Sequence, residues 1–251
     1  MPEINPCMVC VEGLVKTRRQ SESAFELEVP RFTVLRGQMA AVVGDSGCGK
    51  STLLDMLALV MAPTRVARFR INPDAGPPCD VAALWERGDE GALARLRRST
   101  LGYVLQTGGL LPFLNVRGNI CLPGRIKGDG VSPERLKALA RRMGVGNCLE
   151  RMPLTLSIGQ RQRVAILRAL AHRPRLLLAD EPTASVDKSR ARAIMDDMQR
   201  LARDEGVAVV VVTHDLDLVM DRADLAYTFD TVQVSDQTTR SVCRRLREKI
   251  S

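Results

Sequence analysis

The chain has 251 residues, of which 45% are hydrophobic and 26% are charged, the composition of an ordinary globular protein. This composition excludes a disordered tail protein, a collagen-like chain and a small disulfide scaffold. Lysine and arginine outnumber aspartate and glutamate by 37 to 29, and the resulting net charge of +8 suits an anionic partner such as a nucleotide, a nucleic acid or a membrane face.

The sequence has no signal for a membrane span or for secretion. Apolar runs such as 207–212 are far shorter than the ~20 residues of a spanning helix, and no basic segment leads into an apolar stretch at the N-terminus. The seven cysteines fit free thiols in a reducing compartment. Cys7 and Cys10 form a C-x-x-C without a second pair of metal ligands, so we interpret them as small residues of a half-buried strand.

The order of apolar patterns predicts an α/β fold with a mainly parallel sheet. The first thirty-odd residues alternate in polarity and predict antiparallel strands at one edge. Buried parallel strands are predicted for the apolar runs 39–43, 176–179 and 207–212. Helical patterns follow from 50 to about 61, from 158 to about 172 and from 188 to about 205.

Two stretches depart from this alternation. Prolines and glycines divide residues 110–156 into short helical pieces, chiefly 133–143, which predicts a small helical insertion. Near the C-terminus, basic residues are concentrated, and we expect them on a solvated helix face or against anionic lipid heads: Arg240, Arg244, Arg245, Arg247 and Lys249.

The most specific motif is a phosphate-binding loop that follows the first buried strand and opens a helix. It matches G-x-x-x-x-G-K-[ST], and its residues are Gly44, Asp45, Ser46, Gly47, Cys48, Gly49, Lys50, Ser51 and Thr52. Glycines let backbone N–H groups surround phosphate oxygens, and the helix start adds unpaired donors. We expect Lys50 to reach the β- and γ-phosphates and Ser51 to bind Mg²⁺.

A second pair of functional residues ends the apolar strand at 176–179. Asp180 and Glu181 lie at the carboxyl end of that strand, where open α/β sheets bind their ligands. Asp180 is predicted to hold Mg²⁺, and Glu181 to orient or deprotonate an attacking water.

Residues 156–163 read Leu-Ser-Ile-Gly-Gln-Arg-Gln-Arg and begin a helix just before the carboxylate strand. This segment resembles the signature of ATP-binding-cassette (ABC) ATPases. Gln106, the stretch 185–187 with Asp187, and His214 stand where that family has its Q-loop glutamine, D-loop and switch histidine. The segments 101–106, 110–114 and 119–123 look most like bacterial export-type cassettes, including lipoprotein-release, macrolide-export and cell-division types.

The resemblance implies one nucleotide-binding domain with a P-loop NTPase core at 1–106 and 164–251 and a helical subdomain at 107–163. Two such domains would face each other head to tail, with ATP and Mg²⁺ between the phosphate loop of one and the signature helix of the other. Ser157, Gly159 and Gln160, with Asp187, would bind the partner's nucleotide. Glu181, Gln106 and His214 would be catalytic, and Gln106 would join Ser51 and Asp180 around Mg²⁺.

The resemblance also implies partners and a location. We expect a homodimer that drives a separate membrane-spanning, permease-type subunit from the cytoplasmic face of the inner membrane, for export or for mechanical work. Phe113 and Leu114 are candidate docking residues or, equally, insertion core. No nucleic acid is expected as a partner. The alternatives are a cassette ATPase acting on nucleic acid and a weakly active regulatory cassette.

Two positions depart from the family pattern. Ile158 replaces the first glycine of the usual Leu-Ser-Gly-Gly-Gln, which adds bulk at the helix start. Arg18 or Arg19 stands where an aromatic residue commonly stacks on adenine, and Phe25 is expected to face the core, so we expect looser base discrimination. The family tolerates cysteine at the position of Cys48, so this residue is a small filler or, since a helix N-terminus lowers a thiol pKa, a reactive thiol.

Overall fold

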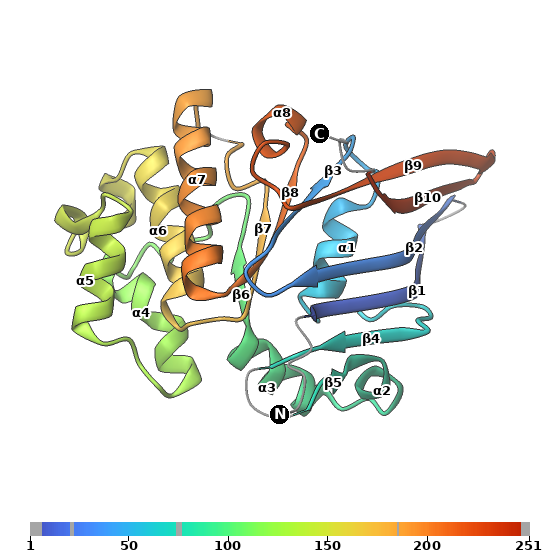
Figure 1. The fold of residues 1–251 in the computed structure, drawn as a ribbon, viewed down its shortest axis with the longest axis horizontal. Helices are drawn as coiled ribbons and strands as arrows, with labels where there is room; N and C mark the ends of the chain where they lie inside the picture. The colour runs from blue at the N-terminus through green and yellow to red at the C-terminus, as the bar shows by residue number, and fades with distance from the viewer. Residues whose placement is uncertain (1–6, 21–22, 74–76, 185, 247–251) are drawn as a thin grey trace.

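A computed structural model describes residues 7–20, 23–73, 77–184 and 186–246, and they form one sheet with helices on both faces (Figure 1). The strand order is β5-β4-β1-β2-β10-β9-β3-β8-β7-β6. The strands are β1 (Cys7–Gln20), β2 (Ser23–Leu35), β3 (Met39–Val43), β4 (Arg68–Ile71), β5 (Cys79–Asp80), β6 (Leu101–Val104), β7 (Leu176–Asp180), β8 (Ala208–Thr213), β9 (Leu225–Ser235) and β10 (Thr238–Arg245).

The half of the sheet from β9 to β6 is parallel throughout. Its strands are covered on both faces, because alternate residues enter two different cores. In β3, Ala41 and Val43 belong to the cluster shared with the helices between β6 and β8, whereas Ala40 and Val42 join the cluster around the first helix. Two covered faces require continuous apolar runs, and the predicted buried parallel strands are confirmed.

The other half of the sheet carries the antiparallel edge. β1 pairs antiparallel with β2, as predicted, and also with β4, which was not predicted. The hairpin of β9 and β10 was not predicted, and β10 joins the two halves by pairing parallel with β2. Arg240, Arg244 and Arg245 lie on this strand, so the expected helix face is wrong, and Arg247 and Lys249 lie outside the described residues.

The helices are α1 (Lys50–Leu57), α2 (Val81–Glu86), α3 (Glu90–Thr100), α4 (Val116–Lys127), α5 (Pro133–Arg142), α6 (Ile158–Ala171), α7 (Lys188–Glu205) and α8 (Leu216–Val219), with 3₁₀ turns η1 (Gly146–Cys148) and η2 (Pro153–Thr155). α6 and α7 match the predicted ranges, and α7 ends on Gly206 in the left-handed conformation. α1 ends four residues earlier than predicted. Leu59 turns the chain with a φ of 61° and is fully buried, so packing overrides the helical pattern.

The helical insertion between β6 and β7 lies at the left of Figure 1. Its α4 continues through Pro123, where the sequence predicted an interruption. Packing of Val116 and Ile120 into the core shared with α6 outweighs the backbone hydrogen bond that a proline removes. α6 crosses the predicted subdomain boundary at 163–164, and that boundary stays a prediction. Over the described part of the chain, no helix is long and apolar enough to cross a membrane.

Candidate nucleotide-binding site

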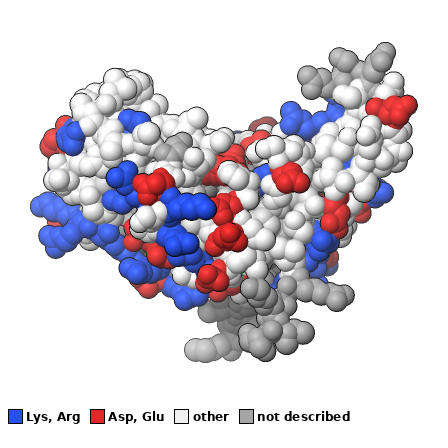
Figure 2. Space-filling model, turned by 90° about the horizontal axis from the view of Figure 1, so that it is seen from above, with Lys and Arg blue, Asp and Glu red and all other residues white. Residues whose placement is uncertain are grey.

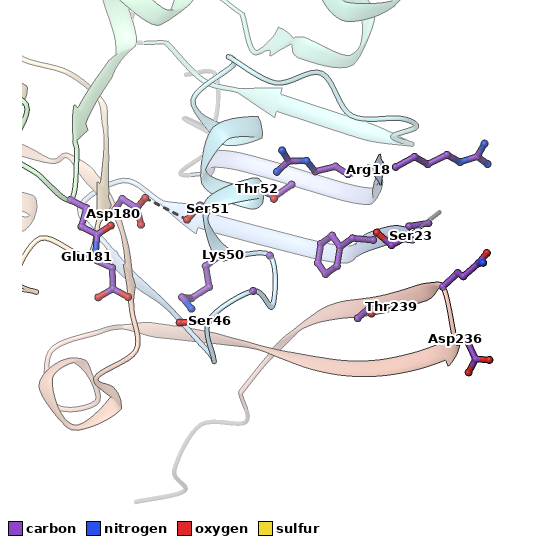
Figure 3. Close-up of a pocket in the computed structure, with 17 residues that line it drawn as sticks. Arg18, Ser23, Ser46, Lys50, Ser51, Thr52, Asp180, Glu181, Asp236 and Thr239 are labelled. Atoms are coloured by element: carbon purple, nitrogen blue, oxygen red, sulfur yellow. Dashed lines mark hydrogen bonds between the residues drawn. The ribbon is translucent and has the colours of Figure 1, made fainter. Parts of the chain in front are cut away.

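A cavity of about 890 Å³ extends from the carboxyl ends of β3 and β7 to the strands β1, β2 and β10 (Figure 3). One end is lined by predicted residues: Ser46, Gly47, Gly49, Lys50, Ser51, Thr52, Gln106, Asp180 and Glu181. The other end is lined by Arg18, Arg19, Ser23, Ala24, Phe25, Asp236, Gln237 and Thr239. Gly44, Asp45 and Cys48 belong to the loop but do not line the cavity.

The loop before α1 requires glycine at position 49 because of its backbone conformation and because of the side chains packed against it. Gly49 has a φ of 108°, and a Cβ there would lie 3.1 Å from Leu27 Cδ1 and 3.2 Å from Phe25 Cζ. Gly49 is also the N-cap of α1, and no side chain caps the helix start. The first backbone N–H groups of α1 are therefore left for an anionic ligand.

The Lys50 ammonium lies across this loop. Its Nζ donates to the Gly44 carbonyl at 2.7 Å and to the Asp45 carbonyl at 2.8 Å, and the residue is only 8% exposed. Two fixed acceptors hold the charge at the centre of the loop, where phosphate oxygens would meet it.

Ser51 and Asp180 converge from α1 and β7, with 3.5 Å between Ser51 Oγ and Asp180 Oδ2 (Figure 3). Burial raises the pKa of the Asp180 carboxyl above its ordinary value of 3.8, and the charges of Glu181 and Asp55 raise it further. A divalent cation would relieve this crowding of carboxylates. A hydroxyl and a carboxylate, with the Gln106 amide also lining the cavity, are hard oxygen donors of the kind that Mg²⁺ prefers.

Glu181 and His214 pair with each other at the ends of β7 and β8. His214 Nδ1 lies 3.0 Å from both carboxylate oxygens of Glu181, whose side chain is 13% exposed against 68% for the imidazole. Glu181 has a φ of 45°, a conformation that costs a non-glycine residue energy and is concentrated at functional sites. The backbone thus turns the carboxylate into the cavity, while His214 contacts it from outside the lining.

The predicted signature residues form a separate group at the start of α6. Ser157 caps the helix by accepting from the Gln160 N–H at 3.2 Å, and Gln160 Oε1 accepts from the Ser157 N–H at 3.0 Å. Ile158 is 50% exposed beside them. None of these residues lines the cavity.

The signature group lies next to the start of α7. A Cβ on Gly159 would lie 3.7 Å from Arg190 Cδ, and Asp187 caps α7 by accepting from the Arg190 N–H. Ser185 lies outside the described residues. Figure 2 views the molecule from above. It shows basic side chains gathered on the side of the helical insertion and acidic side chains nearer the centre of the molecule.

Two expectations at the cavity are corrected. Phe25 was expected to face the core, but it both packs against the core and lines the cavity. Cys48 was expected to have a lowered pKa, but the residue is only 5% exposed, and burial raises the pKa of its thiol. The pKa of the thiol is raised because desolvation of the thiolate outweighs the favourable charge of Lys50.

The residues missed by sequence reasoning are those of the β9–β10 hairpin that line the far end of the cavity. The alternation in Tyr227-Thr-Phe-Asp-Thr-Val-Gln-Val234, followed by the turn residues Ser-Asp-Gln, is a hairpin signal. Pairing of β10 with β2, which brings the hairpin to the cavity, leaves no local signal.

Comparison with known proteins is consistent with this geometry. The family model described as ABC transporter matches residues 27–184. The chain belongs to the ABC transporter family. The lipoprotein-releasing system ATP-binding protein LolD 1 of Rhodospirillum rubrum is 41% identical over 74% of this chain and 80% of its own length. The macrolide export ATP-binding/permease protein MacB of Syntrophobacter fumaroxidans is 38% identical over 74% of this chain and 26% of its own.

A solved structure gives the same result for the fold. The dimeric post-hydrolysis state of the ATP-binding cassette MJ0796, bound to ADP and Pi, superimposes with a TM-score of 0.76 at 29% identity and covers 96% of this chain and 100% of that one. The protein is therefore an ABC cassette ATPase, and its relatives include lipoprotein-release and macrolide-export ATP-binding proteins.

Proposed function

We propose that this cassette forms a head-to-tail homodimer around two ATP and drives a separate membrane-spanning subunit. The observation that supports this most directly is the separation of the two predicted groups. Lys50, Asp180 and Glu181 line the cavity, whereas Ser157 and Gly159 lie outside it at the start of α6. A second copy brings its α6 to the open side of the cavity and completes the site.

In this proposal, the residues at and beside the phosphate loop share the steps of ATP binding and hydrolysis. The loop 44–52 and Lys50 bind the triphosphate, and Ser51, Asp180 and Gln106 hold Mg²⁺, which neutralises charge on the phosphates when bound. Glu181 orients and deprotonates the attacking water, and His214 positions the Glu181 carboxylate and binds the γ-phosphate. The partner's signature helix would present to the same phosphate those first-turn N–H groups that its Ser157 cap leaves free.

We assign the docking surface of the membrane subunit to an apolar groove between β6 and α4. The groove measures about 440 Å³, and its lining includes Leu111, Leu122 and Ile126, the last 59% exposed, together with Arg97 and Arg98. Phe113, two residues after Leu111 in the chain, is 73% exposed, which favours docking over insertion core, whereas Leu114 is half-buried. A short amphipathic segment with acidic residues fits these side chains. The cassette would then lie peripherally at the cytoplasmic face of the inner membrane.

Co-purification tests this function. Tagged Glu181→Gln binds ATP without turning it over, and solubilisation of membranes in mild detergent with Mg-ATP should recover a stoichiometric multi-span membrane protein. The matched control, Glu181→Gln with Phe113→Asp, should bind ATP equally and lose the partner. Recovery of a dimer with no membrane protein, or with nucleic acid, would overturn the proposal.

A further inference from the structure

The end of the cavity away from Lys50 is built by three strands that are distant in sequence. Arg18 of β1 pairs with Phe25 of β2, and Phe25 pairs with Thr239 of β10. Residues directly opposite each other on neighbouring strands point to the same face of a sheet. Arg18, Phe25 and Thr239 therefore form one row of side chains facing the cavity that they line.

The distance of this row from the phosphate loop follows from strand geometry. Two residues along, Leu27 and Ser241 form the row beneath the loop: Leu27 contacts the Gly49 position, and Ser241 Oγ donates to the Cys48 carbonyl at 2.6 Å. Two strand residues span about 7 Å. The ribose and base of a nucleotide whose phosphates occupy the loop must pass over the row of Phe25 and Thr239.

Ion pairs and a backbone hydrogen bond hold the β9–β10 hairpin, which carries Thr239, against β2. Arg240 forms ion pairs with Glu26 and Glu28 on the opposite face, and the Ala24 N–H donates to the Gln237 carbonyl at 2.6 Å. These contacts fix Gln237 at the tip, which reaches the end of the cavity marked by Asp236 in Figure 3. The tip thus forms a preorganised wall of the cavity.

We propose that the β9–β10 hairpin is the second wall of the nucleoside subsite, with the Thr239 hydroxyl and the Gln237 amide hydrogen-bonding the ribose and base of the bound nucleotide. This rests on the proposed binding of the triphosphate by the loop 44–52. The hairpin supplies contacts at a site that has no aromatic residue at the usual stacking position. A hydroxyl and an amide can each donate or accept, so the subsite holds a nucleoside without requiring one particular base.

The test compares a double variant with a matched control on the same hairpin. Gln237→Ala with Thr239→Ala removes both cavity-lining polar groups. Gln233→Ala with Thr238→Ala makes the same changes at positions that do not line the cavity. Equilibrium binding of Mg-ADP and of Mg-pyrophosphate is measured by calorimetry for both variants and the wild type, with circular dichroism to check folding.

We expect the double variant to weaken ADP binding about tenfold, as the loss of two neutral hydrogen bonds would, and to leave pyrophosphate binding unchanged. The control should change neither. An unchanged affinity for ADP would overturn the proposal, and so would an equal weakening of pyrophosphate, which would mean that the hairpin acts only by supporting the loop. If the proposed binding of phosphates by the loop 44–52 is itself wrong, Lys50→Ala will leave pyrophosphate binding unchanged.

Discussion

The two ends of the cavity are built in different ways. The end with the phosphate loop, here called the phosphate end, is built mainly from two short motifs, the loop before α1 and the carboxylate pair at the end of β7, and each motif is contiguous in the sequence. The nucleoside end uses single residues from β1, β2 and β10, which only strand pairing brings together. The predicted phosphate-binding residues thus stand in short motifs that can be recognised in the sequence, whereas the end proposed to contact the base is assembled by strand pairing.

The largest expected effect is at the phosphate end. Glu181→Gln keeps the shape of the side chain but removes the carboxylate that would activate water, so ATP turnover should fall by roughly 100-fold or more while ATP binding is retained. A phosphate-release assay with a parallel binding measurement checks both. The exposed Glu86→Gln serves as control and should match the wild type. Retained turnover would remove Glu181 from the catalytic group.

A smaller effect is expected where the partner is proposed to complete the phosphate end. Ile158 is exposed at the start of α6, and in the proposed dimer its β-branched side chain would add bulk facing the partner. Ile158→Gly should raise ATP turnover about threefold by easing closure of the dimer. This rate gain corresponds to an activation free energy that is lower by about 0.7 kcal/mol. Ile158→Val, which keeps the branch, should behave like the wild type. Unchanged or lower turnover in Ile158→Gly contradicts this.

The third prediction concerns stability at the phosphate end. The pKa of Asp180 is raised in the folded protein, so ionisation of this carboxyl costs stability as the pH rises from near 4 through the raised value. Without Mg²⁺ or nucleotide, Asp180→Asn should raise Tm by about 2 °C at pH 7, and the gain should vanish near pH 4. Thermal scans across pH measure this against the exposed control Asp221→Asn. A Tm that falls at pH 7 would show that the carboxylate stabilises the fold.

The smallest difference is expected at the nucleoside end. Arg18, Thr239 and Gln237 offer contacts that every base can accept, so Kd values for ATP and GTP should agree within about threefold. Competition binding measures the ratio. A strong preference for ATP would show that residues at this end distinguish adenine from guanine through a specific hydrogen bond.

Much of the fold could be predicted because apolar patterns and helix caps are local. Both faces of β3, β7 and β8 are covered, so their apolar runs are unbroken and easily recognised. The helix in the insertion was misjudged at Pro123 because propensity is weak against the packing of Val116 and Ile120. The end of α1 was misjudged because burial of Leu59 holds a left-handed turn.

In the candidate site, too, the local motifs could be predicted from the sequence and the long-range contacts could not. The sequence by itself determined the phosphate loop, the carboxylate pair and the signature helix, because each depends on backbone geometry within a few neighbouring residues. Only the tertiary structure decided that Glu181 meets His214, that Cys48 is a buried thiol with a raised pKa, and that Thr239 lines the nucleotide cavity. These depend on which strands become neighbours and on how completely each side chain leaves water, and both are properties of the whole packed chain.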